Sequence, residues 1–155
     1  MAIPANVIAQ HIIRPTHGQI THSLDNTHTM PQNNQTKPNV MPAAEMYNKG
    51  YEYHQQKEYA QALSWFRKAA LQKNPMAQNM IGKYYELGYG VEQNDAEAAE
   101  WYCKAAQLGY DEGQYNYGRC YEQGIGIAQD MDMAREWWQK AADQGYRPAI
   151  SKLRE

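Results

Sequence analysis

An internal repeat of 36 residues constrains the fold of this chain more than any other feature of its sequence. Shifting the sequence by 36 positions superimposes residues 77–112 on residues 113–148. An earlier copy around Ala62 matches when four residues are deleted from the longer turn of the later copies. Periods of this length are typical of solenoids, in which each repeat packs only against its neighbours. The matched glycine, aromatic and alanine positions include Gly82 and Gly118, Tyr85 and Tyr121, Ala98 and Ala134, and Trp101 and Trp137.

Each repeat has the pattern of two helices joined by a turn. The first helix is expected at 77–87, where Gly88 can take the left-handed C-cap conformation that other residues resist. The second helix is expected to begin at Asn94, with Glu97 as its capping-box partner. Asp130 is the equivalent cap one repeat later. Apolar residues then recur at steps of three and four, which predicts one buried face on each helix.

Glycines interrupt the first helix of each repeat at Gly82 and Gly118. A glycine inside a helix costs about 1 kcal/mol relative to alanine, so its presence needs a reason. A close helix crossing supplies that reason, because a side chain at this position would hold the partner helix away. Small residues on the second helices are the expected partners: Ala62, Ala98 and Ala134.

The order Gly-x-x-Tyr, Gly-x-Gly and Ala-x-x-Trp-Tyr-x-Lys-Ala-Ala resembles the Sel-one-like repeat, a longer-turn relative of the tetratricopeptide repeat. The resemblance implies an all-α fold, a right-handed α-solenoid of antiparallel helix pairs. Three hairpins are expected at about 43–76, 77–112 and 113–148, followed by a short C-terminal capping helix at 149–155. The resemblance also implies a non-catalytic scaffold that binds a peptide or a partner protein in its concave groove.

Residues 1–42 differ in composition from the rest of the chain. The 13 tyrosines, 4 tryptophans and 1 phenylalanine all lie between Tyr47 and Tyr146, whereas the first 42 residues are rich in Thr, Asn, Gln, His and Pro. Such a segment cannot bury enough apolar surface to become ordered, so we expect a disordered polar tail ahead of a repeat domain at 43–155. The alternative for the tail is metal binding through four histidines: His11, His17, His22 and His28.

Charge and hydropathy exclude several classes of partner. The formal net charge of −2 gives no electrostatic attraction to nucleic acid or to an anionic membrane. The mean hydropathy of −0.88 and the lack of a long apolar run predict no membrane insertion. Because the N-terminus has no secretory signal pattern, a cytoplasmic location is expected. The alternative is delivery outside the cell by a non-classical route, as a translocated bacterial effector or host-interaction factor.

Motifs for covalent or cofactor chemistry are missing from the sequence. The serines Ser23, Ser64 and Ser151 lie in neither Gly-x-Ser-x-Gly nor Ser-x-x-Lys. No Gly-Lys-Ser/Thr follows the Gly-x-Gly turns, which indicates turn geometry rather than a phosphate loop. Cys103 and Cys120 are too few for a disulfide framework or a cysteine zinc site. We therefore expect no enzyme, no metal and no cofactor. The alternative is a β-lactam-binding or hydrolysing enzyme like some cysteine-rich relatives of the family.

Residues beside the core positions of each first helix are expected to line the concave groove, because that helix faces the groove in stacked helix pairs. Lys83 and Arg119 are equivalent positions one repeat apart and could together grip a carboxylate or an acidic peptide. Alternatively, they pair with Glu86 and Glu122, three residues further along their own helices. The candidate partner-binding residues are Tyr47, Tyr51, His54, Asn79, Lys83, Glu86, Tyr115, Arg119 and Glu122.

Overall fold

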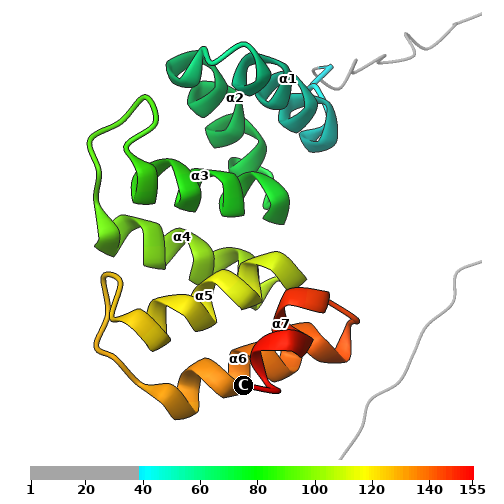
Figure 1. Cartoon of the computed structure of the whole chain (residues 1–155). Helices are drawn as coiled ribbons and strands as arrows, with labels where there is room; N and C mark the ends of the chain where they lie inside the picture. Colours follow the sequence, from blue (N-terminus) through cyan, green and yellow to red (C-terminus); the bar gives the residue numbers. More distant parts are fainter. Residues whose placement is uncertain (1–38) are drawn as a thin grey trace, which may run out of the picture. The chain divides into compact units, whose positions relative to one another are not determined.

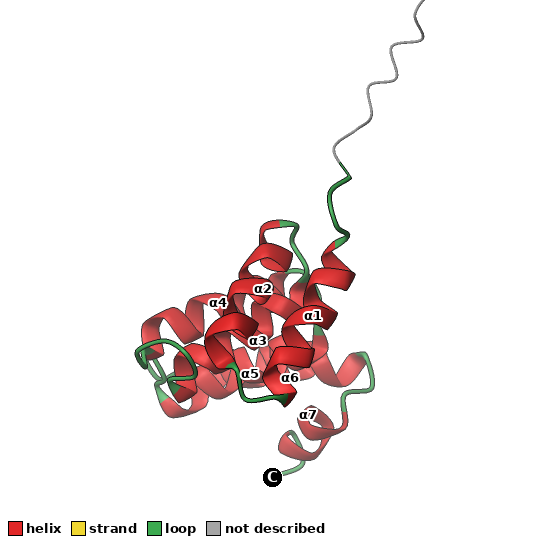
Figure 2. Cartoon of the chain, turned by 90° about the horizontal axis from the view of Figure 1, so that it is seen from above, coloured by secondary structure: helices red, strands yellow, loops and turns green. Residues whose placement is uncertain are grey.

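The computed structural model describes residues 39–155 and shows a stack of antiparallel helix pairs (Figure 1). Within these residues the chain forms helices and loops but no strand (Figure 2). The predicted all-α solenoid is confirmed. The expected polar tail, with its histidines, lies outside the described residues up to position 38. The helices are α1 (Ala43–Gln55), α2 (Tyr59–Leu71), α3 (Pro75–Leu87), α4 (Asp95–Gln107), α5 (Asp111–Gln123), α6 (Met131–Asp143) and α7 (Arg147–Lys152).

The pairs α1/α2, α3/α4 and α5/α6 form the three hairpins, and α7 follows as a short C-terminal helix (Figure 1). α3 begins at Pro75 and α5 at Asp111, each two residues ahead of the boundary drawn from the sequence. The start of α3 has a local cause. The Asn74 side-chain oxygen accepts a hydrogen bond from the Ala77 backbone N–H at 2.9 Å, and Pro75 occupies the first turn, where its missing N–H costs nothing.

The N-cap residues expected from the sequence are present in the structure, but the full capping box is not, because the Asn94 backbone N–H donates to the Tyr85 carbonyl oxygen at 2.9 Å and not to the Glu97 side chain. The Asn94 side chain accepts a hydrogen bond from the Glu97 backbone N–H at 3.1 Å, and the Asp130 side chain caps α6 in the same way. α3 and α5 end at Gly88 and Gly124, whose φ angles of 70° and 68° lie in the left-handed region that favours glycine. In the second and third hairpins, the end of the first helix and the start of the second helix are therefore fixed by residues close to them in the sequence.

The second glycine of each Gly-x-Gly turn packs against the preceding hairpin. A Cβ on Gly90 would lie 2.7 Å from the backbone nitrogen of Ala60, near the start of α2. A Cβ on Gly126 would lie 2.1 Å from the backbone oxygen of Asp95, at the start of α4. These turns therefore join successive hairpins by close backbone packing, as the turn interpretation of the sequence required.

The predicted close crossing inside each hairpin is confirmed, and its main neighbour is an aromatic ring. A Cβ on Gly82 would lie 2.7 Å from the ring of Tyr102 and 3.2 Å from the backbone oxygen of Ala98. The sequence identified the alanine but not the ring. The other two crossings repeat the arrangement, with Gly50 against Phe66 and Ala62, and Gly118 against Trp138 and Ala134.

Aromatic rings take the place of aliphatic side chains in the core. Phe66, Tyr84, Tyr102 and Trp138 are each at most 2% exposed. Rings meet edge to face across hairpin boundaries, as where the centroids of Phe66 and Tyr84 lie 5.5 Å apart. Buried alanines let the helix backbones approach closely between these rings. This combination explains how a chain with few Leu, Ile and Val residues builds a core.

Candidate functional site

The first helices α1, α3 and α5 carry all of the partner-binding residues expected from the sequence, and we call the surface that they form the first-helix face. On α1, Tyr47, Tyr51 and His54 recur at steps of four and three, which aligns them along one side of the helix. The ring centroids of Tyr47 and Tyr51 lie 6.3 Å apart, and those of Tyr51 and His54 lie 5.8 Å apart. The result is an aromatic row whose outermost member, Tyr51, is 43% exposed.

A pocket of about 220 Å³ lies between α1 and α3 on this face. Three of the expected residues line it: Tyr51, His54 and Lys83. Leu87 also lines the pocket and is 57% exposed, so a large apolar side chain stands at its mouth. The remaining lining residues, which the sequence analysis missed, are Met80, Tyr84 and Tyr89.

A hydrogen bond between α1 and α3 fixes the base of this pocket. His54 Nδ1 lies 2.8 Å from the hydroxyl oxygen of Tyr84. Burial is the main cause that raises the pKa of Tyr84 far above its ordinary value, so this hydroxyl stays protonated at physiological pH. Tyr84 also packs edge to face against Tyr59 and Tyr89, which holds its ring in place. These contacts hold the His54 and Tyr84 side chains in place where they line the pocket.

Lys83 forms an ion pair with Glu112 of α5, in the next hairpin. Glu112 also accepts a hydrogen bond from the Tyr110 hydroxyl at 3.0 Å. The pairing considered from the sequence, between Lys83 and Glu86 on the same helix, is not the one that forms. Lys83 thus connects two hairpins, and its charge is already paired with a carboxylate of the protein itself.

Arg119 lies in a polar network that crosses three helices. Its guanidinium donates to Glu86 Oε1 at 2.8 Å and to Asn116 Oδ1 at 3.3 Å. Asn116 in turn donates to Asn79 Oδ1 at 2.9 Å, and the Tyr102 hydroxyl donates to Glu86 Oε2 at 2.5 Å. Asn79 is only 1% exposed and therefore belongs to the core, whereas the sequence analysis expected it to line the groove. Arg119 is likewise committed to an internal carboxylate.

The last two candidates lie at the C-terminal end of the first-helix face. Tyr115 is half-buried and packs against Tyr146, with ring centroids 5.5 Å apart. Glu122 pairs with Lys152 of α7 at 2.8 Å. In each hairpin boundary from α3 onward, an acid and a base therefore pair between successive first helices. This pairing offsets the charges of the face, where Tyr51 and Leu87 are the exposed large apolar side chains.

Both cysteines of the chain, Cys103 and Cys120, lie within the described residues 39–155. Neither cysteine in this part of the chain is in a disulfide: Cys103 is half-buried, and burial raises the pKa of the buried Cys120 thiol to about 12. No cluster of three or more His, Cys, Asp or Glu side chains suited to a metal ion occurs among the described residues. None of the described helices has the length and apolar composition needed to span a bilayer.

Repeated glycine-crossed hairpins joined by Gly-x-Gly turns define a helical repeat protein of the tetratricopeptide-like class. A model of the Sel1 repeat family matches residues 43–74, 75–110 and 111–146. The chain therefore belongs to the Sel1 repeat family, as the sequence resemblance predicted. Proteins of this family commonly mediate protein–protein interactions.

Solved structures show the same architecture. A Sel1 repeat protein from Oxalobacter formigenes is 42% identical with a TM-score of 0.67, over 69% of this chain and 44% of that one. The protective antigen c5321 of uropathogenic Escherichia coli is 39% identical with a TM-score of 0.68, over 72% of this chain and 25% of that one. The chain thus spans less than half the length of either protein. No curated protein matches it.

A third structure supports the fold alone. Helicobacter pylori cysteine rich protein B is 19% identical with a TM-score of 0.59, over 72% of this chain and 94% of that one. Its sequence is too distant to transfer any residue role. The present chain also differs in having only two cysteines in total.

Proposed function

We propose that this protein is a non-catalytic interaction module that binds a peptide or a partner protein on the first-helix face. The observation that carries the proposal is the pocket between α1 and α3, with Tyr51 and Leu87 exposed at its mouth. Pre-formed concave sites with exposed aromatic and aliphatic anchors are where binding free energy concentrates in protein interfaces. The internal pairing of Lys83 and Arg119 makes apolar contact the main contributor, with charge in a secondary role.

The binding surface can be mapped by site-specific photo-crosslinking in the full chain. A crosslinkable amino acid placed at Tyr51 or Leu87 should capture one and the same partner, whereas the same probe at Leu71 should not. Leu71 is the matched control because it is an apolar side chain that is 86% exposed outside the pocket. Capture at Leu71 alone would show that the partner binds elsewhere.

Affinity measurements on the captured partner give the quantitative test. Leu87→Ser and Tyr51→Ala should each weaken binding by tenfold or more, which corresponds to about 1.4 kcal/mol. Leu71→Ser should leave the affinity unchanged, and all three variants should keep the helical circular dichroism signal. Unchanged affinity in both pocket variants would reject the first-helix face as the binding surface.

We expect the repeat domain at residues 43–155 to carry the binding activity. We also expect the protein to act in the cytoplasm. The chain should neither hydrolyse nitrocefin nor take up a covalent penicillin label, and either reaction would favour the β-lactam alternative. A translocation reporter fused to residues 1–42 should stay inside the producing cell. Its export would favour the alternative of a delivered effector or host-interaction factor.

A further inference from the structure

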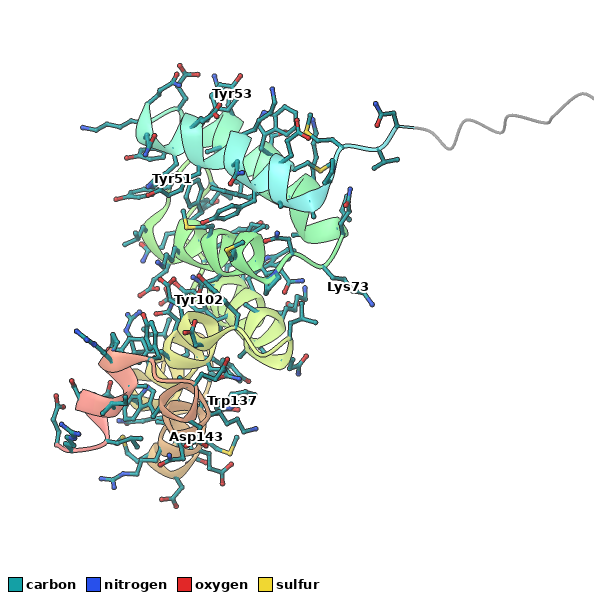
Figure 3. All side chains as sticks on the ribbon, turned by 90° about the vertical axis from the view of Figure 1, so that its right-hand side faces the viewer. Tyr51, Tyr53, Lys73, Tyr102, Trp137 and Asp143 are labelled. Carbon is teal, nitrogen blue, oxygen red and sulfur yellow. The ribbon has the colours of Figure 1, made fainter. Side chains whose placement is uncertain are left out.

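A second pocket, of about 190 Å³, lies where the turn between α2 and α3 meets the end of α4. Figure 3 shows Lys73, one of its lining residues, on the opposite side of the helix stack from Tyr51. The pocket is therefore separate from the first-helix site. Its lining residues are Lys73, Gln78, Lys104, Gln107 and Leu108.

Gln78 gives this pocket an unusual chemical feature. The residue is only 6% exposed, yet its side-chain oxygen Oε1 has no hydrogen-bond partner. Leaving a buried acceptor without a donor is unfavourable, and most buried polar atoms in proteins are paired. Gln78, a lining residue of the pocket, thus has a buried carbonyl that lacks a donor, and because this oxygen is closed to solvent, a ligand reaches it only when a neighbouring side chain moves aside.

The third hairpin shows which group satisfies this position. Gln114 is the counterpart of Gln78 one repeat later, and its Oε1 accepts a hydrogen bond from Gln144 Nε2 at 2.8 Å. The same Gln144 amide donates to the backbone oxygen of Gly109 at 3.0 Å. One carboxamide therefore bridges a side-chain carbonyl and a backbone carbonyl.

The second hairpin keeps the receiving positions but lacks the amide. The counterpart of Gln144 is Leu108, which has no donor, and the counterpart of Gly109 is Lys73. We propose that the pocket around Gln78 binds the side-chain carboxamide of an Asn or Gln residue from a partner protein. The two N–H groups of such an amide would donate to Gln78 Oε1 and to the Lys73 backbone oxygen, as Gln144 does in the third hairpin.

The charges around the pocket select among possible donors. Lys73 and Lys104 both line it, and although Lys104 pairs with Glu100 at 2.8 Å, a cationic donor such as Arg or Lys would meet the like charge of Lys73. A neutral carboxamide does not meet this repulsion. Leu108 is 48% exposed and offers apolar contact to the methylene groups of the incoming side chain. This site shares no lining residue with the first-helix pocket, so a test of one site does not decide the other.

A small probe tests the site in the full chain without knowledge of the partner. N-acetyl-glutamine methylamide should shift the side-chain amide NMR signals of Gln78 in a saturable manner. N-acetyl-alanine methylamide, which has the same backbone groups without the carboxamide, should not. Leu108→Gln should weaken the glutamine probe at least tenfold, because the protein's own amide then fills the pocket, whereas Leu108→Met should retain binding.

Thermal unfolding provides an independent readout of the same geometry. Leu108→Gln should melt at a higher temperature than Leu108→Met, because it supplies the missing donor. Equal melting temperatures, or equal shifts with both probes, would overturn the proposal. Dimerisation of the wild-type chain that Leu108→Gln abolishes would also overturn it, by assigning the pocket to a second copy of this chain.

Discussion

At the scale of single residues, the most constrained feature is the contact between a helix glycine and an aromatic ring in each hairpin. Gly50 lies against Phe66, and a Cβ on this glycine would stand 2.7 Å from two ring carbons. Phe66 is fully buried, so its ring has no free space into which to move. The ring therefore makes glycine the only residue that fits this crossing without rearrangement.

Gly50→Ala is expected to destabilise the protein although alanine is the better helix former. The propensity gain of about 1 kcal/mol is smaller than the cost of forcing a methyl group into a packed crossing, so we expect a net loss of about 1 to 2 kcal/mol. Urea unfolding followed by circular dichroism measures this loss. In a Phe66→Leu background the same substitution should cost less, because the two sites are in contact. A net gain in stability from Gly50→Ala alone would contradict the crossing.

At the scale of helices, acid–base pairs between successive first helices connect the hairpins. The pair between Arg119 and Glu86 is the best shielded of these, with side chains that are 26% and 18% exposed. Arg119 also satisfies the Asn116 side-chain oxygen, so its removal leaves two acceptors without a donor. The guanidinium thus adds a shielded contact between α3 and α5 to the Lys83–Glu112 ion pair and the Asn116–Asn79 hydrogen bond.

Arg119→Met, which keeps most of the apolar stem, is expected to lower the free energy of unfolding by about 2 to 3 kcal/mol. Lys104→Met is the matched control, because Lys104 pairs with Glu100 within one helix and both side chains are more exposed. That control should cost no more than about 0.5 kcal/mol. Chemical denaturation measures the free energy of unfolding of both variants. An equal decrease in the two variants would show that the Arg119 network contributes no more than an ordinary surface ion pair.

Helices and their caps follow from the sequence because each depends on residues close together in the chain. Asn94, Asp130 and Gly88 act on their own helix ends, so local pattern is sufficient to place them. The site was only partly predictable. Tyr51 and Lys83, two of the residues expected to line a groove, both line the pocket between α1 and α3, whereas the ion-pair partner of Lys83 was not predicted.

The errors at the site have one physical origin, which is the stacking of one hairpin on the next. Helical periodicity places Asn79 on the same side of α3 as Lys83, but Asn116 of α5 covers it. Periodicity gives the angle of a side chain around its own helix and says nothing about which neighbouring helix lies above it. For the same reason, the unpaired oxygen of Gln78 could be recognised only after the repeats had been compared in three dimensions.

At the scale of the whole repeat domain, each hairpin packs mainly on its neighbours, so stability should be distributed as a sum of repeats and interfaces. The C-terminal helix α7 covers one end of this arrangement. Ala149 is fully buried and belongs to the same cluster as Trp138, with Leu153 packed against it. Lys152 adds its ion pair to Glu122.

Removing residues 147–155 should therefore loosen the third hairpin while leaving the first nearly unchanged. The truncation exposes the faces of α5 and α6 that α7 covers, so backbone amides in these two helices should exchange with deuterium at least tenfold faster. Amides in α1 and α2, two hairpins away, should exchange at the rate of the full chain. Hydrogen exchange with mass spectrometry measures both regions in one experiment. A uniform acceleration across residues 43–146 would show instead that the three hairpins unfold as a single cooperative unit.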